Sequence, residues 1–275
     1  MTIGIGFRFR DAILLGADSQ LTGIASKTFG TKIAFCFDTG YSLLLAGAGC
    51  FDCMNVYFQN LTKTLDKSKK TLRAARTHIQ KTLRDLYLDR IYPNRTFRDP
   101  DDGVEFLIAF KGSDDGLAFW KTEETSVLDV NNGCESIGSG GPAADFFSAY
   151  VYQSNMKPTE ALAVAVDILR QTKRFSPFCS GPSEIRVMDS NGRITMPLVE
   201  PLKQMEDYLQ GCEQKTRELM IRCADANLSE RDIDQHLQSF SQHIKNLTAQ
   251  LKFPLQKTLL EWFGSTVSGR TSVSS

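Results

Sequence analysis

The sequence predicts an α+β protein in which two antiparallel β-sheets pack face to face, with a layer of helices outside each sheet. Two observations favour this four-layer αββα sandwich. Stretches with the two-residue period of strands alternate with helical stretches, and the helical stretches come in pairs, whereas single helices between strands would indicate a parallel sheet. Beyond about residue 200 only helical patterns remain. We therefore expect a sandwich domain over residues 1–200, a helical extension over 201–264 and a disordered Ser/Thr/Gly tail over 265–275.

Strand patterns open the chain and are followed by the first pair of helices. Residues 3–9 alternate apolar side chains with glycine and arginine, as in a strand with one buried face, and a turn at Asp11–Ala12 leads into a second apolar run. The expected elements are strands over residues 3–9, 13–18, 32–37 and 41–46, followed by amphipathic helices over residues 51–65 and 72–86.

The second half of the chain repeats this order. The expected elements are strands over residues 105–110 and 117–120, helices over 142–153 and 158–173, and a last pair of strands over 184–188 and 193–197. Ser190-Asn-Gly192 is the expected hairpin turn of that pair. In the extension, one long helix is expected over residues 202–223, and Ser229 and Asp232 form a capping box that begins a second helix ending near residue 251.

Composition limits the classes of function. In 275 residues, 32 Lys and Arg balance 32 Asp and Glu, so no net charge attracts nucleic acid or an anionic membrane. No run approaches the roughly 20 apolar residues of a membrane span, and no secretory signal pattern opens the chain. Seven cysteines are an odd number without the density of a disulfide scaffold. We expect a soluble, cytoplasmic protein with reduced thiols that binds neither nucleic acid nor membranes.

Cys50 and Cys53 form a C-x-x-C pair at the start of an expected helix. No second pair and no histidine follow at zinc spacing, so the pair does not indicate a metal site. Core packing is the expected role of these thiols, and a redox role is the alternative.

The beginning of the chain holds the residues with the strongest chemical signal. Thr2 follows the initiator Met, which Met aminopeptidases remove before small residues. The new terminus would carry a hydroxyl and an α-amine whose reference pKa, about 7.7–8.0, suits proton transfer near neutral pH. Asp18 ends the second strand, where it can lie beside Thr2, and Lys32 opens the next strand, where a buried ammonium needs a carboxylate partner. Taken alone, the three residues also have ordinary interpretations: a chain terminus, a strand-end carboxylate and a surface charge.

Four segments together resemble the β-type subunits of the proteasome family and, more closely, the peptidase subunit of the bacterial two-component ATP-dependent protease. They are "MTIGIGFRFRDAILLGADSQLT", "AGAGCFDC", "IGSGGPAADFF" and "FCSGPSEIRVMDSNG", and they follow in the family's order over about residues 2–200. The resemblance implies the N-terminal-nucleophile hydrolase fold. It also implies a threonine endopeptidase that cleaves unfolded proteins inside a self-assembled ring or barrel.

The resemblance further implies roles for individual residues. Thr2 matches the nucleophile, Lys32 the group that tunes its hydroxyl, and Asp18 the carboxylate that holds the lysine, with Lys27 a weaker candidate for the lysine. The other matches are Ser139 and Ser180 beside the amine and a water, a backbone N–H of Gly47, Ala48 or Gly49 as oxyanion donor, and Leu21, Gly30, Ala46 and Cys50 lining the substrate pocket. No metal or organic cofactor is implied. The implied partners are further copies of the chain, peptide substrates and, as an option, an ATP-dependent unfoldase.

Three departures from the family pattern leave alternatives open. The family has Thr where this chain has Ile3, and the loop before Lys32 is shorter here. Proteasome β-type subunits also place an Asp before the last Ser-Gly, where this chain reads "FSPFCSG". The alternatives are an inactive proteasome-like scaffold or assembly protein, and an N-terminal-nucleophile amidase that acts on small molecules.

Overall fold

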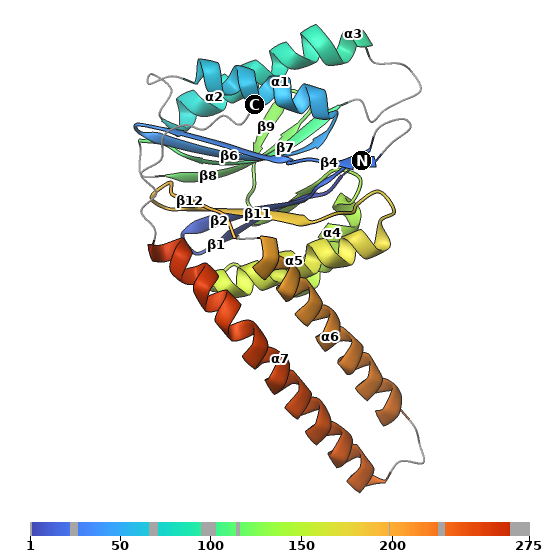
Figure 1. Ribbon diagram of the computed structural model, residues 1–275. Helices are drawn as coiled ribbons and strands as arrows, with labels where there is room; N and C mark the ends of the chain where they lie inside the picture. Colours follow the sequence, from blue (N-terminus) through green and yellow to red (C-terminus); the bar gives the residue numbers. More distant parts are fainter. Residues whose placement is uncertain are drawn as a thin grey trace. The chain divides into compact units, whose positions relative to one another are not determined.

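The structure of the chain is a computed structural model that describes residues 2–22, 27–65, 71–94, 103–113, 116–197, 199–224 and 229–264 (Figure 1). The chain divides into two compact units, residues 1–199 and residues 200–275. The first unit holds both sheets and the helices that cover them. The tail over residues 265–275, expected to be disordered, lies outside the described residues.

The first sheet contains the strands that open the chain. Its order is β10 (Cys134–Ile137), β1 (Gly4–Phe9), β2 (Ala12–Asp18), β11 (Ser183–Asp189) and β12 (Ile194–Thr195), with every neighbouring pair antiparallel. β1 and β2 form the predicted hairpin, in which Gly4 lies opposite Ala17. This register brings residue 2 and residue 18 to the same end of the sheet.

The second sheet is also antiparallel. Its order is β5 (Ile33–Asp38), β6 (Tyr41–Gly49), β7 (Val104–Lys111), β8 (Leu117–Glu123) and β9 (Ser126–Asp129). A separate two-stranded hairpin, β3 (Gln20–Thr22) with β4 (Lys27–Phe29), lies in the chain between the two sheets.

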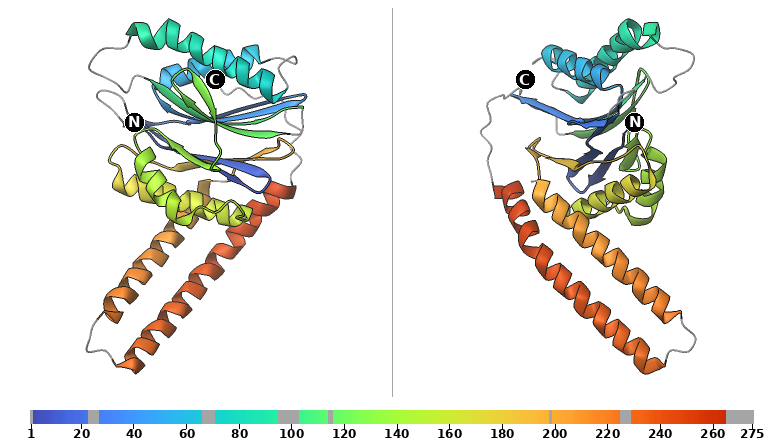
Figure 2. Two further views of the ribbon diagram at one scale, coloured as in Figure 1. Left: turned by 180° about the vertical axis from the view of Figure 1, so that it is seen from behind. Right: turned by 45° about the vertical axis from the view of Figure 1, so that its right-hand side comes forward.

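Helices cover the outer face of each sheet, as Figures 1 and 2 show. α1 (Phe51–Thr64) and α2 (Leu72–Leu86) lie over the β5–β9 sheet, and α2 continues through a π-helical turn (Tyr87–Ile91) into α3 (Tyr92–Asn94). α4 (Gly141–Val151) and α5 (Pro158–Phe175) lie over the sheet that contains β1 and β2. This arrangement confirms the predicted four-layer αββα sandwich.

β1 is buried on both faces, which corrects the expectation of a strand with one buried face. Its apolar residues are buried, and so are its glycines on the opposite face. A Cβ on Gly6 would lie only 2.5 Å from the ring of Phe119 on β8. Because glycine has no side chain, the second sheet packs directly against the backbone of β1.

Several short strands were not expected from the sequence. β3, β4, β9 and β10 are each only three or four residues long, too short for a two-residue period to stand out. The connecting segments over residues 93–103 and 112–116 lie partly outside the described residues.

The second unit contains two long helices, α6 (Val199–Cys223) and α7 (Glu230–Gly264). Two side-chain contacts join them in antiparallel order, Tyr208 with Thr248 at 3.3 Å and Arg222 with His236 at 3.4 Å. Ser229 accepts from the N–H of Asp232 at 3.2 Å while the Asp232 carboxylate accepts from the N–H of Ser229, which confirms the capping box. α7 runs well past residue 251, where the sequence predicts its end. Within the described ranges, no helix combines the length and the apolar character that crossing a membrane requires.

Candidate active site

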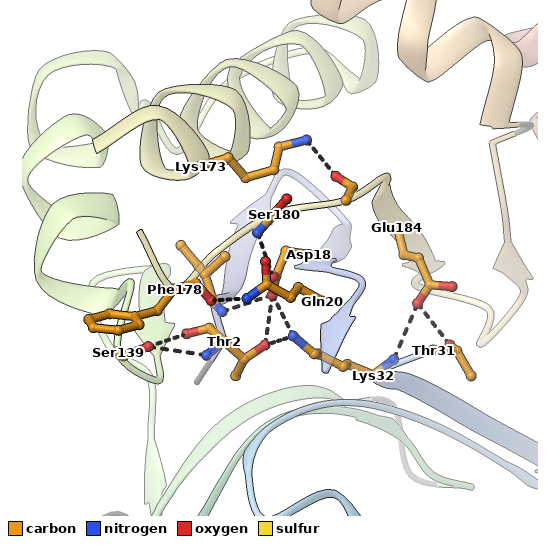
Figure 3. Close-up of polar contacts among 12 residues, drawn as sticks. Thr2, Asp18, Gln20, Thr31, Lys32, Ser139, Lys173, Phe178, Ser180 and Glu184 are labelled. Atoms are coloured by element: carbon orange, nitrogen blue, oxygen red, sulfur yellow. Dashed lines mark hydrogen bonds and ion pairs between the residues drawn. The ribbon is translucent and has the colours of Figure 1, made fainter. Parts of the chain in front are cut away.

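Thr2 lies two residues before the start of β1 and is 2% exposed. Its hydroxyl donates a hydrogen bond to Oδ1 of Asp18 at 2.7 Å (Figure 3). The same carboxylate oxygen accepts from the backbone N–H of Ile3 at 3.0 Å. The β1–β2 hairpin therefore joins Thr2 and Asp18, as the spacing of the two residues predicts.

Lys32 completes a buried triangle with Thr2 and Asp18. Its Nζ donates to Oγ1 of Thr2 and, at 2.7 Å, to Oδ1 of Asp18. The side chains of Lys32 and Asp18 are 2% and 0% exposed. Burial lowers the pKa of Lys32, because the charged ammonium loses its hydration, and the neighbouring Asp18 carboxylate opposes this shift. Proton exchange between Lys32 and the Thr2 hydroxyl is easier as a result.

Ser139 lies on the other side of Thr2, in the loop between β10 and α4. The backbone N–H of Thr2 donates to Oγ of Ser139 at 3.1 Å, and the N–H of Gly140 donates to the Thr2 carbonyl at 3.1 Å. Gly138 begins this loop with a φ of +82°, and a Cβ there would lie 2.5 Å from the Thr2 carbonyl oxygen. The loop can approach Thr2 this closely only because residue 138 is glycine.

Ser180 reaches the triangle through its backbone. Its N–H donates to Oδ2 of Asp18 at 3.1 Å, while its side chain is exposed. Both oxygens of Asp18 are therefore held by hydrogen bonds. Ser180 therefore lies beside Asp18, and its contact there comes from the amide and not from the hydroxyl.

The three candidate oxyanion donors differ in what their N–H groups contact. The N–H of Gly47 donates to the carbonyl of Lys32 at 2.9 Å, so this amide holds Lys32 in place. Successive N–H groups of a strand point to opposite edges. The N–H of Ala48 therefore points toward β7. The N–H of Gly49 points toward the opposite edge, beyond the part of β6 that pairs with β5, since Ile33, the first residue of β5, is paired with Ala46.

Of the expected pocket residues, Leu21 and Gly30 lie next to each other. A Cβ on Gly30 would lie 2.7 Å from Leu21, so these two residues are in contact. Ala46 is fully buried in the core between the sheets, because its side chain shares a face of β6 with Leu44, and it packs there without reaching the surface. Cys50 is a partly buried residue before α1.

Phe29 and Phe178 add aromatic surface near the triangle that the sequence does not predict. They are 65% and 43% exposed. A Cβ on Gly181 would lie 2.7 Å from the ring of Phe29, so this ring lies beside the Ser180–Gly181 segment. No local pattern marks either residue, because each comes near the site only when β3, β4 and the segment before β11 are folded together.

The segment before β11 is held by residues that the sequence also does not identify. Nζ of Lys173 on α5 donates to the Gly181 carbonyl at 3.2 Å and to Oγ of Ser183 at 2.9 Å. The side-chain amide of Gln20 donates to the Phe178 carbonyl at 3.4 Å. Cys179 is 2% exposed, and burial raises the pKa of its thiol.

Metal and redox chemistry find no support in this part of the fold. Across the described ranges, no three His, Cys, Asp or Glu side chains gather as metal ligands would. Burial raises the pKa of Cys53 to about 12, so this thiol of the C-x-x-C pair is protonated at neutral pH and is a poor nucleophile.

No protein-family model matches the chain, and no curated protein is similar to it in sequence. Its structure is nevertheless similar to solved structures of Anbu, one of them described as an ancestral beta-subunit. Anbu from Yersinia bercovieri is 13% identical with a TM-score of 0.66, covering 83% of this chain and 99% of that chain.

Two further Anbu structures agree with this result. A Gly-1 mutant from Hyphomicrobium sp. strain MC1 is 11% identical with a TM-score of 0.66, covering 80% of this chain and 99% of that one. A helical assembly of the Anbu complex from Pseudomonas aeruginosa is 12% identical with a TM-score of 0.65, covering 78% and 95%. The chain therefore has the proteasome-like fold of the N-terminal-nucleophile hydrolases.

Proposed function

We propose that the chain is a threonine-type endopeptidase whose nucleophile is Thr2 after removal of Met1. The observation that carries this proposal is the buried triangle of Thr2 Oγ1, Lys32 Nζ and Asp18 Oδ1. A hydroxyl becomes a useful nucleophile when an adjacent base can take its proton. Lys32, with its pKa lowered by burial, is such a base, and Asp18 fixes its position.

In the proposed reaction, neutral Lys32 takes the hydroxyl proton while Thr2 Oγ1 attacks the peptide carbonyl carbon. The resulting oxyanion accepts the N–H of Gly49, the candidate donor that points toward the edge where β5 has ended. Lys32 then returns the proton to the departing amine, the C–N bond breaks, and an ester on Thr2 remains. The α-amine of Thr2, freed by removal of Met1 and lying beside Ser139, takes a proton from water while the resulting hydroxide attacks the ester carbonyl carbon. The ester C–O bond breaks, the acid leaves, and the α-ammonium returns its proton to Oγ1, which restores the hydroxyl and the amine.

The substrates we propose are unfolded polypeptides with apolar side chains. Leu21 and Gly30 form a small apolar contact, and the exposed rings of Phe29 and Phe178 extend it near the triangle. Self-association into an enclosing assembly would exclude folded proteins, and the Pseudomonas aeruginosa Anbu structure is described as a helical assembly. Seven free cysteines support a reducing compartment such as the cytoplasm.

A peptide epoxyketone tests this function because it reacts with both the hydroxyl and the α-amine of an N-terminal threonine. We expect one covalent adduct on Thr2 by mass spectrometry, and Thr2→Ala should abolish peptide cleavage while the oligomeric state is unchanged. A chain that retains Met1 and forms no adduct would instead be a scaffold. An adduct on Thr2 without peptide cleavage, together with release of ammonia from small amides, would indicate an amidase.

A further inference from the structure

The backbone of Lys32 needs support from outside its own sheet. Lys32 lies just before β5, which begins at Ile33. Its carbonyl accepts from the N–H of Gly47 at 2.9 Å, but its own N–H lies beyond the paired part of β5. An N–H that is shielded from water and has no acceptor destabilises the fold, so the position of Lys32 depends on what accepts this group.

The acceptor is Glu184, which comes from the other sheet. Oε2 of Glu184 accepts from the N–H of Lys32 at 3.3 Å and from the hydroxyl of Thr31 at 2.8 Å (Figure 3). Glu184 is a residue of β11, whereas Thr31 and Lys32 lead into β5. One carboxylate thus bridges the two sheets at the edge of the candidate site.

The register of β11 links this bridge to Asp18. Ser183 lies opposite Asp18, and Glu184 lies opposite Ala17. Ser180, three residues before Ser183, donates its N–H to Asp18. One short segment therefore positions both acidic partners of Lys32, Asp18 at its ammonium and Glu184 at its backbone.

The ionisable groups that face Lys32 are few. They are Asp18 from β2, Cys179 from the segment before β11, and Glu184 from β11, with the α-amine of Thr2 once Met1 is removed. Burial lowers the pKa of Lys32, and the negative charges of Asp18 and Glu184 raise it toward its usual value. The Glu184 charge therefore moderates the shift that burial causes.

We propose that Glu184 is a positioning residue that fixes the backbone of Lys32 through its carboxylate and places a negative charge beside it. This proposal rests on the proposed function only where it concerns catalysis. The hydrogen bonds and the charge of Glu184 act on Lys32 whether or not the chain cleaves peptides. Glu184 itself need not touch the substrate or the reacting atoms.

Three variants separate the hydrogen bonds from the charge. Glu184→Gln keeps an acceptor oxygen and removes the charge. The acidic limb of the kcat/KM–pH profile should therefore move to lower pH, with kcat at the optimum largely kept. Glu184→Ala removes both, so kcat should also fall by about 10- to 100-fold as Lys32 is misplaced. Thr31→Val removes the hydrogen bond from the Thr31 hydroxyl to Glu184 and should leave the acidic limb of the pH profile unchanged. Glu123→Gln, on the exposed end of β8, is the matched control for loss of a glutamate charge.

A second readout does not depend on activity. The ¹⁵Nζ resonance of Lys32, assigned by its absence in Lys32→Arg, should titrate at lower pH in Glu184→Gln than in the unchanged chain. An inactive chain with this shift would support the positioning role and refute the peptidase. If Glu184→Gln and Glu184→Ala, both folded by circular dichroism, leave the Lys32 titration unchanged, the positioning proposal is wrong, whatever the activity.

Discussion

Two carboxylate–cation pairs in the sandwich have the same separation and opposite surroundings. Asp18 and Lys32 are 2.7 Å apart with side chains 0% and 2% exposed, whereas Asp129 and Arg76 are also 2.7 Å apart with side chains 54% and 37% exposed. The exposed pair keeps most of its hydration and is screened by water and salt. The buried pair has lost its hydration, so neighbouring charges and hydrogen bonds act more strongly on the protonation and position of its side chains. Distance alone therefore does not distinguish a buried pair from a surface pair.

The largest effect should come from removing one charge of the buried pair. Asp18→Asn leaves the Lys32 ammonium without its partner, and the free energy of unfolding should fall by about 3–5 kcal/mol. Peptide cleavage should be lost as well. The matched control is Asp129→Asn, which should cost about 1 kcal/mol or less. Denaturant unfolding of both variants measures this difference, and equal losses would contradict the contrast between the two pairs.

Gly138→Ala should disturb the site through the backbone. Strain at its φ of +82° should cost about 1–3 kcal/mol, and the new methyl would displace the Thr2 carbonyl, 2.5 Å away. Gly192→Ala is the control, because its φ of +78° is similar but its Cβ would meet side-chain atoms and no backbone. These are the Ser42 hydroxyl at 2.9 Å, which can rotate away, Cγ of Lys111 at 3.2 Å and Cβ of Ser42 at 3.3 Å. Thermal unfolding should show similar losses. Only Gly138→Ala should lose peptide cleavage, and an active Gly138→Ala would show that the loop tolerates a shift of Thr2.

The pH dependence of stability should report the environment of Lys32. The pKa of Lys32 is lower in the folded than in the unfolded chain, where it is about 10.4. At pH values between the two pKa values the unfolded state binds more protons, so the free energy of unfolding rises with pH. Compared with Lys32→Met, the unchanged chain should gain stability through this window, by at most about 1.4 kcal/mol per pH unit. Below the folded pKa the difference should be constant. Urea unfolding at several pH values measures it, and parallel curves throughout would mean that burial does not shift this lysine.

The smallest effect should come from an exposed pair in the second unit. Arg217 donates to Glu213 at 3.3 Å, one turn apart on α6, and the arginine side chain is 61% exposed. Arg217→Ala should change the free energy of unfolding by about 0.5 kcal/mol or less, and salt should reduce this further. Calorimetry at low and high salt checks the prediction. A loss as large as that of Asp18→Asn would mean that exposure does not govern the strength of these pairs.

Much of the fold could be predicted because long elements carry their own pattern. The β1–β2 hairpin, the strands β5 to β8 and the helices α1, α2, α4 and α5 have enough residues to show a strand or helix period. The double burial of β1 could not be predicted, because glycine on one face is equally compatible with solvent and with a close-packed sheet. The strands of three or four residues were missed for lack of length.

The candidate site also has contacts that the sequence could predict and contacts that it could not. Thr2 and Asp18 are 16 residues apart on one hairpin, so local structure is enough to bring them together. Lys32 and Glu184 are 152 residues apart and meet through one backbone N–H, a group that carries no sequence signal. The contacts of Ser180 with Asp18 and of Gly47 with Lys32 are also made by backbone amides.

The sequence by itself determined the order of the long strands and helices, the apolar face of each, and the presence of a hydroxyl, a carboxylate and an amine near adjoining strand ends. The tertiary structure alone decided which amides hold the lysine, that Ala46 packs in the core, and that Glu184 reaches across from the other sheet. The physical reason is that hydrophobic periodicity is a local property of the chain, whereas desolvation and hydrogen-bond geometry arise only where distant segments exclude water together.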